Sequence, residues 1–317
     1  MNSKNTSPLY DEVLRAFSYI GGKSRYVEKL YQYFPQNFSS FYDVCGGSGV
    51  VTFSMKFPTA CNKVVLNDYD PTLYNFYITL KGKRGKELEK RLIEFDYDTY
   101  DKLDWTGDSA ALDDFVMLDE VDAAVYTYRQ IVSSYSNTRK DYIKKAEGYL
   151  NSVTKKNIPL IRERLQNIEV TNRDFIDILK EIKDTNAFVY IDVPYRIDTR
   201  EGRPLYNYEL EEEKHDEMLH ILKSAPYMWA LSGYREENLF EDDKYDSMLS
   251  AFSAYTVEID TYKFSGRNIA KESLFEEDNA AEIEWALSDS MEMPEGGFKE
   301  NGGKTPVKEI LWRNGQY

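Results

Sequence analysis

Hydrophobic positions along the chain follow two patterns: short apolar runs that end in acidic or glycine-rich turns, and longer stretches of helical periodicity. The apolar runs predict buried strands at 41–44, 63–66, 186–191, 227–231 and 309–312. Helical periodicity predicts helices at about 23–33, 50–57 and 210–223. Strands that alternate with helices in this way are typical of a parallel sheet covered by helices, so the pattern predicts an α/β fold.

The stretch from 74 to about 168 differs from the rest, because it is mostly helical in pattern, rich in tyrosine and without a clear strand signal. Pro159 is predicted to end the helical part, since proline removes a backbone donor and clashes with the preceding turn. A short extended segment is predicted around Val170. No internal repeat is visible.

Composition narrows the class of protein. The 317 residues carry a formal net charge of −15, which disfavours a polyanionic partner. The charge is uneven, however: basic residues dominate 125–170, between acidic blocks at 92–122 and 236–290. Two cysteines are too few for a disulfide framework and indicate a reducing compartment. With a polar start and no apolar run near the 18 or so residues of a membrane span, we expect a cytoplasmic protein.

A first candidate site lies in the N-terminal part. The strand at 41–44 leads into Cys45-Gly46-Gly47-Ser48-Gly49, then a helix, then a second strand that ends at Asn67-Asp68. Such a glycine turn can bring the backbone close to a ligand, although it can equally serve only to pack a helix on a sheet. Asp68 follows Gly46 at nearly the spacing, about 20 residues, at which nucleotide-binding folds place a ribose-binding carboxylate.

A second candidate site is Asp192-Val193-Pro194-Tyr195, which follows the buried strand at 186–191. Ligands of open α/β sheets bind at the carboxyl ends of the strands. The alternative is that the acid initiates a turn and the tyrosine is packed beside it.

Five motifs in this order resemble the Dam-like (D12 class) adenine-specific DNA N6-methyltransferases. They are Tyr19-Ile20-Gly21-Gly22-Lys23, Asp43 to Gly49, Asn67-Asp68-Tyr69-Asp70-Pro71, Asn172-Arg173-Asp174-Phe175 and Asp192-Val193-Pro194-Tyr195. The closing strand at 309–314 is also similar to that family. The resemblance covers residues 15 to 314 and is weakest between about 82 and 165.

The resemblance implies a Rossmann-like class I methyltransferase sheet in residues 1–81 and 166–317, with a helical target-recognition insertion at 82–165. It further implies S-adenosylmethionine as cofactor, double-stranded DNA as substrate and action as a monomer. It leaves open whether a partner restriction enzyme exists. The cofactor-binding residues that it implies are Tyr19, Lys23 near the cofactor's carboxylate, Asp43, Gly46, Gly47, Ser48, Gly49, Asp68 at the ribose, and Asp174 with Phe175 at the adenine.

The catalytic residues implied are Asp192, Val193, Pro194 and Tyr195. The Asp192 carboxylate and the Val193 carbonyl would accept both N–H bonds of the target amine and stabilise the positive charge that grows there during transfer. Tyr195 would stack on a base flipped out of the duplex. Val193 stands where the family has a proline, so the loop loses a fixed φ. Cys45 replaces an aromatic residue, and we expect a small buried hydrophobe rather than a reactive thiol.

Alternatives remain at this stage. The same acid and carbonyl can hold the N4 amine of cytosine, and a cofactor-binding protein without turnover would also fit Val193 and the net charge. The basic residues Arg139, Lys140, Lys144 and Lys145 are candidate phosphate contacts, or else belong to a solvated helical face. Arg196, Arg200 and Arg203 offer a second place for DNA. His215 and His220, five residues apart and without nearby cysteines, predict no metal site. The DNA sequence recognised depends on a few side chains of the insertion.

Overall fold

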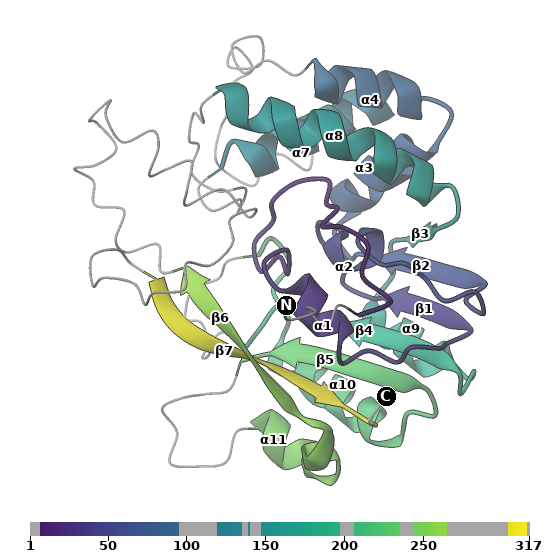
Figure 1. The fold of residues 1–317 in the computed structure, drawn as a ribbon, viewed down its shortest axis with the longest axis vertical. Coiled ribbons are helices and arrows are strands. Elements are labelled where there is room, and N and C mark those ends of the chain that lie inside the picture. The colour runs from purple at the N-terminus through teal and green to yellow at the C-terminus, as the bar shows by residue number, and fades with distance from the viewer. Residues whose placement is uncertain are drawn as a thin grey trace, which may run out of the picture.

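The computed structural model describes residues 7–94, 119–134, 139, 147–196, 206–234, 244–264 and 304–315. Lys140, Lys144, Lys145, Arg200, Arg203 and the tail from 278 to 303 lie outside these residues. The described strands form one mixed seven-stranded sheet in the order β3-β2-β1-β4-β5-β7-β6 (Figure 1).

Five strands are parallel neighbours: β1 (Ser40–Asp43), β2 (Lys63–Asn67), β3 (Glu169–Thr171), β4 (Ala187–Ile191) and β5 (Met228–Gly233). β7 (Lys304–Arg313) runs antiparallel to β5 and to β6 (Val257–Phe264) on its other side. The five strands predicted from apolar runs are thus confirmed, and the extended segment at Val170 is β3. The sequence pattern missed β6, because its alternation of apolar and polar residues lies in an acidic block.

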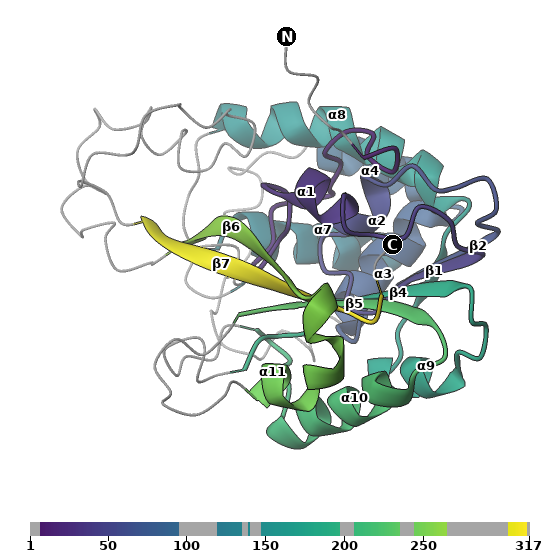
Figure 2. The ribbon, with the colours of Figure 1, turned by 60° about the horizontal axis from the view of Figure 1, so that its bottom comes forward.

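Helices cover both faces of the sheet (Figure 2). One face carries α1 (Val27–Tyr31), α2 (Val50–Phe53), α3 (Pro71–Lys81), α4 (Gly85–Ile93), α7 (Glu120–Val132) and α8 (Glu147–Leu165). The other face carries α9 (Phe175–Glu181), α10 (Glu212–Ser224), α11 (Lys244–Met248) and the 3₁₀ turn Ser250–Tyr255. The predicted α/β architecture is therefore correct, while α1 and α2 are shorter than their sequence patterns suggested and α9 was not predicted.

The prediction that Pro159 ends a helix is wrong, because Pro159 lies inside α8. The proline costs about 3 kcal/mol in a helix interior. Its neighbours Ile158, Ile161 and Leu165 are fully buried, and burial of three such side chains contributes roughly 4.5 to 9 kcal/mol. Tertiary packing of this helix face outweighs the local preference.

The helices from the range 82–165 do not form a separate core. Leu88 of α4, Tyr128 of α7 and Ile161 of α8 belong to the same buried cluster as Phe53 and Phe76 beside the sheet. Figure 1 shows α4, α7 and α8 grouped around α3. These helices are consequently held rigidly against the part of the chain that carries the glycine turn.

The strand order decides where the motifs meet. From β1 the chain moves outward to β2 and β3, then returns to β4 on the opposite side of β1. The carboxyl ends of β1, β2 and β4 lie at one edge of the sheet, around the point where the strand order reverses. In open α/β sheets this switch point is the preferred position for a ligand.

Candidate active site

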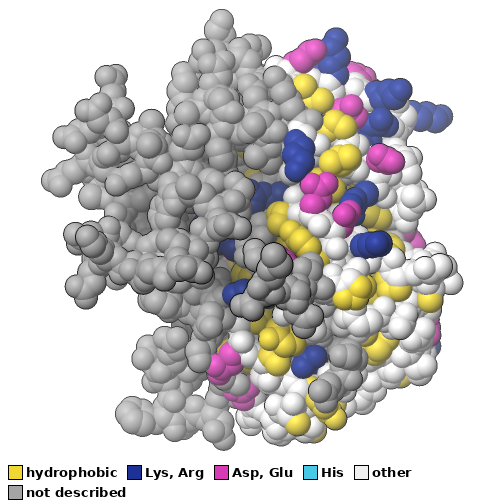
Figure 3. All heavy atoms as spheres, viewed as in Figure 1, with side chains coloured by type: hydrophobic (Ala, Val, Ile, Leu, Met, Phe, Trp, Pro, Cys, Tyr) yellow, Lys and Arg dark blue, Asp and Glu magenta, His cyan; other side chains and the backbone are white. Residues whose placement is uncertain are grey.

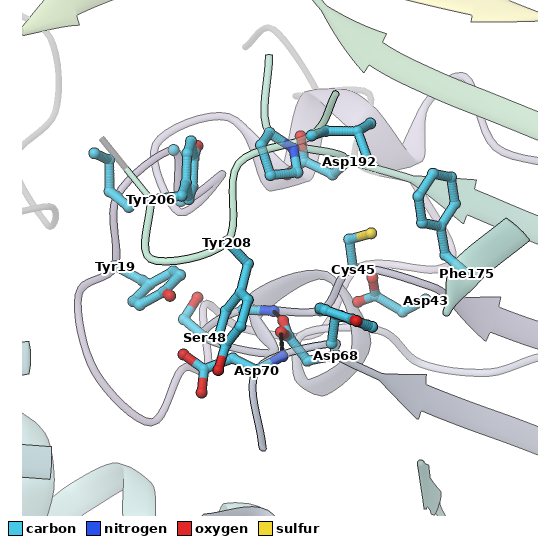
Figure 4. Close-up of a pocket in the computed structure, with 18 of the residues that line it drawn as sticks. Tyr19, Asp43, Cys45, Ser48, Asp68, Asp70, Phe175, Asp192, Tyr206 and Tyr208 are labelled. Atoms are coloured by element: carbon cyan, nitrogen blue, oxygen red, sulfur yellow. Dashed lines mark hydrogen bonds between the residues drawn. The ribbon is translucent and has the colours of Figure 1, made fainter. Parts of the chain in front are cut away.

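A cavity of about 310 Å³ lies at this switch point (Figure 4). That volume is at the lower end of the range of about 300 to 1,000 Å³ typical of small-molecule sites. Most of the residues singled out from the sequence line it, namely Tyr19, Lys23, Asp43, Gly46, Gly47, Ser48, Asp68, Asp174, Phe175, Asp192 and Pro194. Gly49, Val193 and Tyr195 are not among the lining residues: Gly49 precedes α2, and the other two are packed behind the wall, 2% and 8% exposed.

The glycine turn needs glycine for two physical reasons. Gly47 and Gly49 have φ of 52° and 71°, in the left-handed region that other residues rarely adopt. A Cβ on Gly46 would lie 2.2 Å from Cδ1 of Leu66, so a side chain here would force the buried Leu66 side chain to move. The turn therefore brings bare backbone to the floor of the cavity.

Asp68, which follows β2, braces this turn. Its Oδ2 accepts from the amide of Gly47 at 2.8 Å and its Oδ1 from the amide of Asp70 at 2.9 Å. Burial and the neighbouring Asp70 raise the pKa of Asp68 to about 6. The sequence predicted a ribose contact at Asp68; the structure adds a role in holding the turn, and each oxygen keeps a second lone pair for a ligand.

Asp43, at the end of β1, is 2% exposed. Its Oδ2 accepts from the Thr52 hydroxyl at 2.7 Å, while its Oδ1 is buried without a hydrogen-bond partner among the described residues. Burial raises the pKa of Asp43 to about 7, although the Thr52 hydrogen bond opposes this. A buried carboxylate oxygen without a partner is costly, so this wall of the cavity favours a ligand that carries a cation or a hydrogen-bond donor.

Lys23 lies beside Asp192 at the opposite wall. Its side chain is 2% exposed, and its ammonium is 2.6 Å from Oδ1 of Asp192 and donates to the Tyr195 hydroxyl at 2.8 Å. Burial opposes the charged ammonium, but Asp192 and Glu309 together raise the pKa of Lys23 above its usual value. Burial also raises the pKa of Asp192, and the Lys23 charge partly counters this. The sequence interpretation gave Lys23 to the cofactor's carboxylate, whereas the structure pairs it with the acid of the second motif.

Tyr195 is held by its hydroxyl and by its ring. The hydroxyl donates to Oε1 of Glu309, a fully buried residue of β7. The ring packs edge-on against Tyr234, with centroids 4.8 Å apart. The orientation of the ring is therefore fixed before any base arrives.

Asp174 and Phe175 line the cavity, and Phe175 lies at the end away from Tyr19 (Figure 4). Oδ1 of Asp174 caps α9 by accepting from the amide of Ile176 at 3.0 Å, and Oδ2 is paired with Lys214. Binding of an adenine amino group to this carboxylate remains a prediction.

Sequence reasoning missed several residues of the site. Tyr206 and Tyr208 line the cavity, and the Tyr208 ring lies edge-on to Tyr69 with centroids 5.5 Å apart (Figure 4). They come from the segment between the second motif and the helix predicted at 210–223, to which the sequence interpretation gave no role in the site, although its two tyrosines were a usable signal. Glu309 was assigned to a strand without a role; a lone acid at the start of an apolar run was the signal there.

Three described arginines of the basic segment are paired with carboxylates of the protein. The Arg139 side chain is only 6% exposed, pairs with Asp70 at 2.7 Å and donates to Oε1 of Gln130 at 2.8 Å. Arg162 and Arg164 are paired with Glu89 and Asp11. Over the region of α4 and α8, Figure 3 shows cationic and anionic side chains lying among one another. Arg139 therefore has a structural partner in place of the solvent-facing position that a phosphate contact requires.

Two smaller expectations concern cysteine and histidine. Burial, followed by Asp68 and Asp43, raises the pKa of the Cys45 thiol well above its usual value, which disfavours a thiolate. Nδ1 of the buried His215 lies 2.5 Å from the Tyr245 hydroxyl. Within the described ranges no group of three or more His, Cys, Asp or Glu side chains is placed to hold a metal ion.

A search of the described helices for a membrane span found no helix with the necessary length and apolar character.

The parallel sheet with an antiparallel β7 between β5 and β6, and a cavity at the β1–β4 switch point, defines a Rossmann-like class I methyltransferase fold. The family model of the D12 class N6 adenine-specific DNA methyltransferases matches residues 19–260, and the chain belongs to this family. Its function is accordingly adenine-specific DNA methylation, and nothing in the match favours the cytosine alternative. A comparison with curated proteins found no match.

Proposed function

We propose that this chain transfers a methyl group from S-adenosylmethionine to N6 of an adenine flipped out of double-stranded DNA, and that the reaction takes place in the cavity at the β1–β4 switch point. One observation carries the proposal. The same cavity joins the glycine turn and the unpartnered Oδ1 of Asp43 to the carboxylate of Asp192. D12 methyltransferases use S-adenosylmethionine in general, and the cavity supplies complementary groups for it.

The residues present fit that cofactor. Oδ1 of Asp43 suits its ammonium, and the bare backbone of Gly46 to Gly49 admits its amino-acid end. Asp68 is placed for ribose hydroxyls, and Asp174 with Phe175 for the adenine. When bound, the cofactor supplies a sulfonium methyl group as the electrophile. Residues of the protein bind and orient the target amine and stabilise the charge that develops on it.

The target amine is a poor nucleophile, because its lone pair is delocalised into the ring. We assign its two N–H bonds to the Asp192 carboxylate and the Val193 carbonyl, which pull the nitrogen toward tetrahedral geometry. The same acceptors stabilise the positive charge that develops during transfer. Pro194 stiffens the loop beside the cavity, and alignment of the reacting atoms supplies much of the remaining rate. Tyr195 is only 8% exposed, so stacking of the flipped base on its ring requires that the ring be uncovered when DNA binds.

Target recognition is assigned to residues 82–165, and the chemistry to residues 1–81 and 166–317. Among the four candidate phosphate contacts, we retain Lys140, Lys144 and Lys145, because Arg139 is committed to Asp70. We further propose that the protein acts as a monomer in the cytoplasm, where a free Cys45 thiol stays reduced.

The test is Asp192→Asn assayed with adenine-containing duplex DNA. Methyl transfer should fall by about a hundredfold or more, as when one transition-state hydrogen-bonding group is removed. The affinity for the cofactor, measured by calorimetry, should change only a few-fold, because Asp192 is proposed to bind the target amine and not the cofactor. Asp177→Asn, on an exposed position of α9, is the matched control. More than a tenth of wild-type activity in Asp192→Asn, or 4-methylcytosine as the product, would overturn the proposal.

A further inference from the structure

A charged cluster begins at the wall of the cavity, extends behind it and brings together distant parts of the chain. It consists of Lys23, Asp192, Tyr195 and Glu309. Glu309 comes from β7, the last described strand, and lies beyond residues 19–260 that match the family model. Its side chain is fully buried, which is unusual for a glutamate unless its charge is balanced.

The contacts within this cluster form a chain. Nζ of Lys23 is 2.6 Å from Oδ1 of Asp192 and 3.5 Å from Oε1 of Glu309. The Tyr195 hydroxyl accepts from Lys23 at 2.8 Å and donates to Glu309. Lys23 also donates to the Gly21 carbonyl at 3.0 Å, which ties the cluster to the Gly21-Gly22 segment just before Lys23. One cation thus stands between two carboxylates.

We propose that Glu309 is a positioning residue for methyl transfer: it balances the Lys23 ammonium, so that the charge of Asp192 remains available to the target amine. The proposal rests on the function proposed above, because it assumes that Asp192 addresses that amine.

The argument is one of charge. A Lys23–Asp192 pair alone is neutral, and an uncompensated ammonium 2.6 Å from Asp192 opposes the positive charge that develops on the amine. With Glu309 the cluster carries one net negative charge. Charges in a site of low dielectric constant act more strongly than they do in water, so this single charge matters for a cationic transition state.

Glu309 also acts on geometry. Through Oε1 it fixes the Tyr195 hydroxyl, and Tyr195 follows Asp192 by three residues in the same loop. Strand pairing fixes Glu309 itself, because Ile259 of β6 pairs with it and Gly233 of β5 pairs with the next residue, Ile310. The last strand therefore sets the position of a group that acts on the catalytic loop.

The experiment compares single-turnover methyl transfer at saturating cofactor and duplex in wild type, Glu309→Gln and the double variant Lys23→Met/Glu309→Gln. Glutamine keeps the shape and an acceptor for Tyr195 but removes the charge. We expect Glu309→Gln to be slower by about tenfold or more, a loss of the order expected for one electrostatic interaction. Its affinity for S-adenosylmethionine and its KM for DNA should change less than about threefold.

The double variant separates an electrostatic role from a merely structural one. With both charges removed the cluster again carries one negative charge, so the double variant should transfer methyl at least as fast as Glu309→Gln alone. Losses that multiply would overturn the proposal, as would unchanged transfer in Glu309→Gln. Glu258→Gln, at an exposed position of the neighbouring strand β6, is the matched control and should behave as wild type.

A fallback variant covers the case of misfolding, and the results of the Asp192→Asn assay separate a failure of the proposed function from a failure of the role of Glu309. If Glu309→Gln does not fold, Glu309→Asp is compared with the double variant: both leave the cluster with one net negative charge, so their transfer rates should agree within a few-fold, and a difference of about tenfold or more refutes the inference. A wild-type protein without adenine methylation, or an active Asp192→Asn variant, refutes the proposed function itself. Active wild type, inactive Asp192→Asn and fully active Glu309→Gln refute only the role of Glu309.

Discussion

Replacing Arg139 is predicted to lower the stability of the folded protein, because this residue forms a buried ion pair. Its guanidinium is paired with Asp70 at 2.7 Å, and the two side chains are only 6% and 5% exposed. Arg139→Met removes the cation and leaves the Asp70 carboxylate buried without it. Breaking a buried pair in this way costs about 3 to 5 kcal/mol. At about 2 to 4 °C per kcal/mol for a large domain, the melting temperature should fall by roughly 6 to 20 °C.

Companion variants divide this loss into its causes. Asp70 also begins α3 by accepting from the Thr72 amide at 2.8 Å, and asparagine is an equally good residue for that position. Asp70→Asn combined with Arg139→Met should therefore recover part of the loss. Arg139 has a φ of 63°, so Arg139→Gly loses the same pair but relieves about 1 to 2 kcal/mol of backbone strain.

The assay is denaturant unfolding followed by circular dichroism, with the salt dependence of DNA binding measured in parallel. Arg84→Met, which removes exposed ion pairs with Glu87 and Asp119, is the control and should leave unfolding unchanged within error. A loss below about 1 kcal/mol for Arg139→Met would refute the buried-pair argument. A flatter salt dependence of DNA binding with intact stability would return Arg139 to the phosphate contacts.

Three other predictions concern pH, the catalytic loop and DNA. Because burial raises the pKa of Asp43 to about 7 when folded, against an ordinary 3.8, the cofactor-free protein should lose stability as pH rises from about 4 to 7. Asp43→Asn should flatten that slope in denaturation curves recorded across this range. Val193→Pro keeps the accepting carbonyl and stiffens the loop, so turnover in steady-state assays should be equal or faster; extensive loss of folded protein would show that the native φ or amide excludes proline. Neutralising Lys144 and Lys145 to glutamine should flatten the plot of log K against log salt by about one to two units, at 0.9 per phosphate contact. An unchanged slope would place the DNA elsewhere, for example along Arg196, Arg200 and Arg203.

The sequence was informative where the relevant physics is local. Runs such as 41–44 and 186–191 are mainly apolar, with β-branched or aromatic residues, and turn residues stop them, so these strands and their ends could be predicted within one residue. The last strand, predicted at 309–312, begins earlier, at Lys304. The glycine turn could be predicted because only glycine adopts the φ of Gly47 and Gly49 without strain. Since parallel strands present their carboxyl ends at one edge, the sequence also indicated that Asp43, Asp68 and Asp192 would share a site.

The tertiary structure alone decided which charges meet. No local pattern indicates that Arg139 would be buried against Asp70, or that Lys23 would pair with Asp192. Glu309 reaches that pair only because β7 enters the sheet between β5 and β6. Likewise, Pro159 remains helical because the buried face of α8 outweighs a local penalty. Local propensity acts over a few residues, whereas burial and ion pairing depend on which segments the completed sheet brings together, and these segments lie far apart in the sequence.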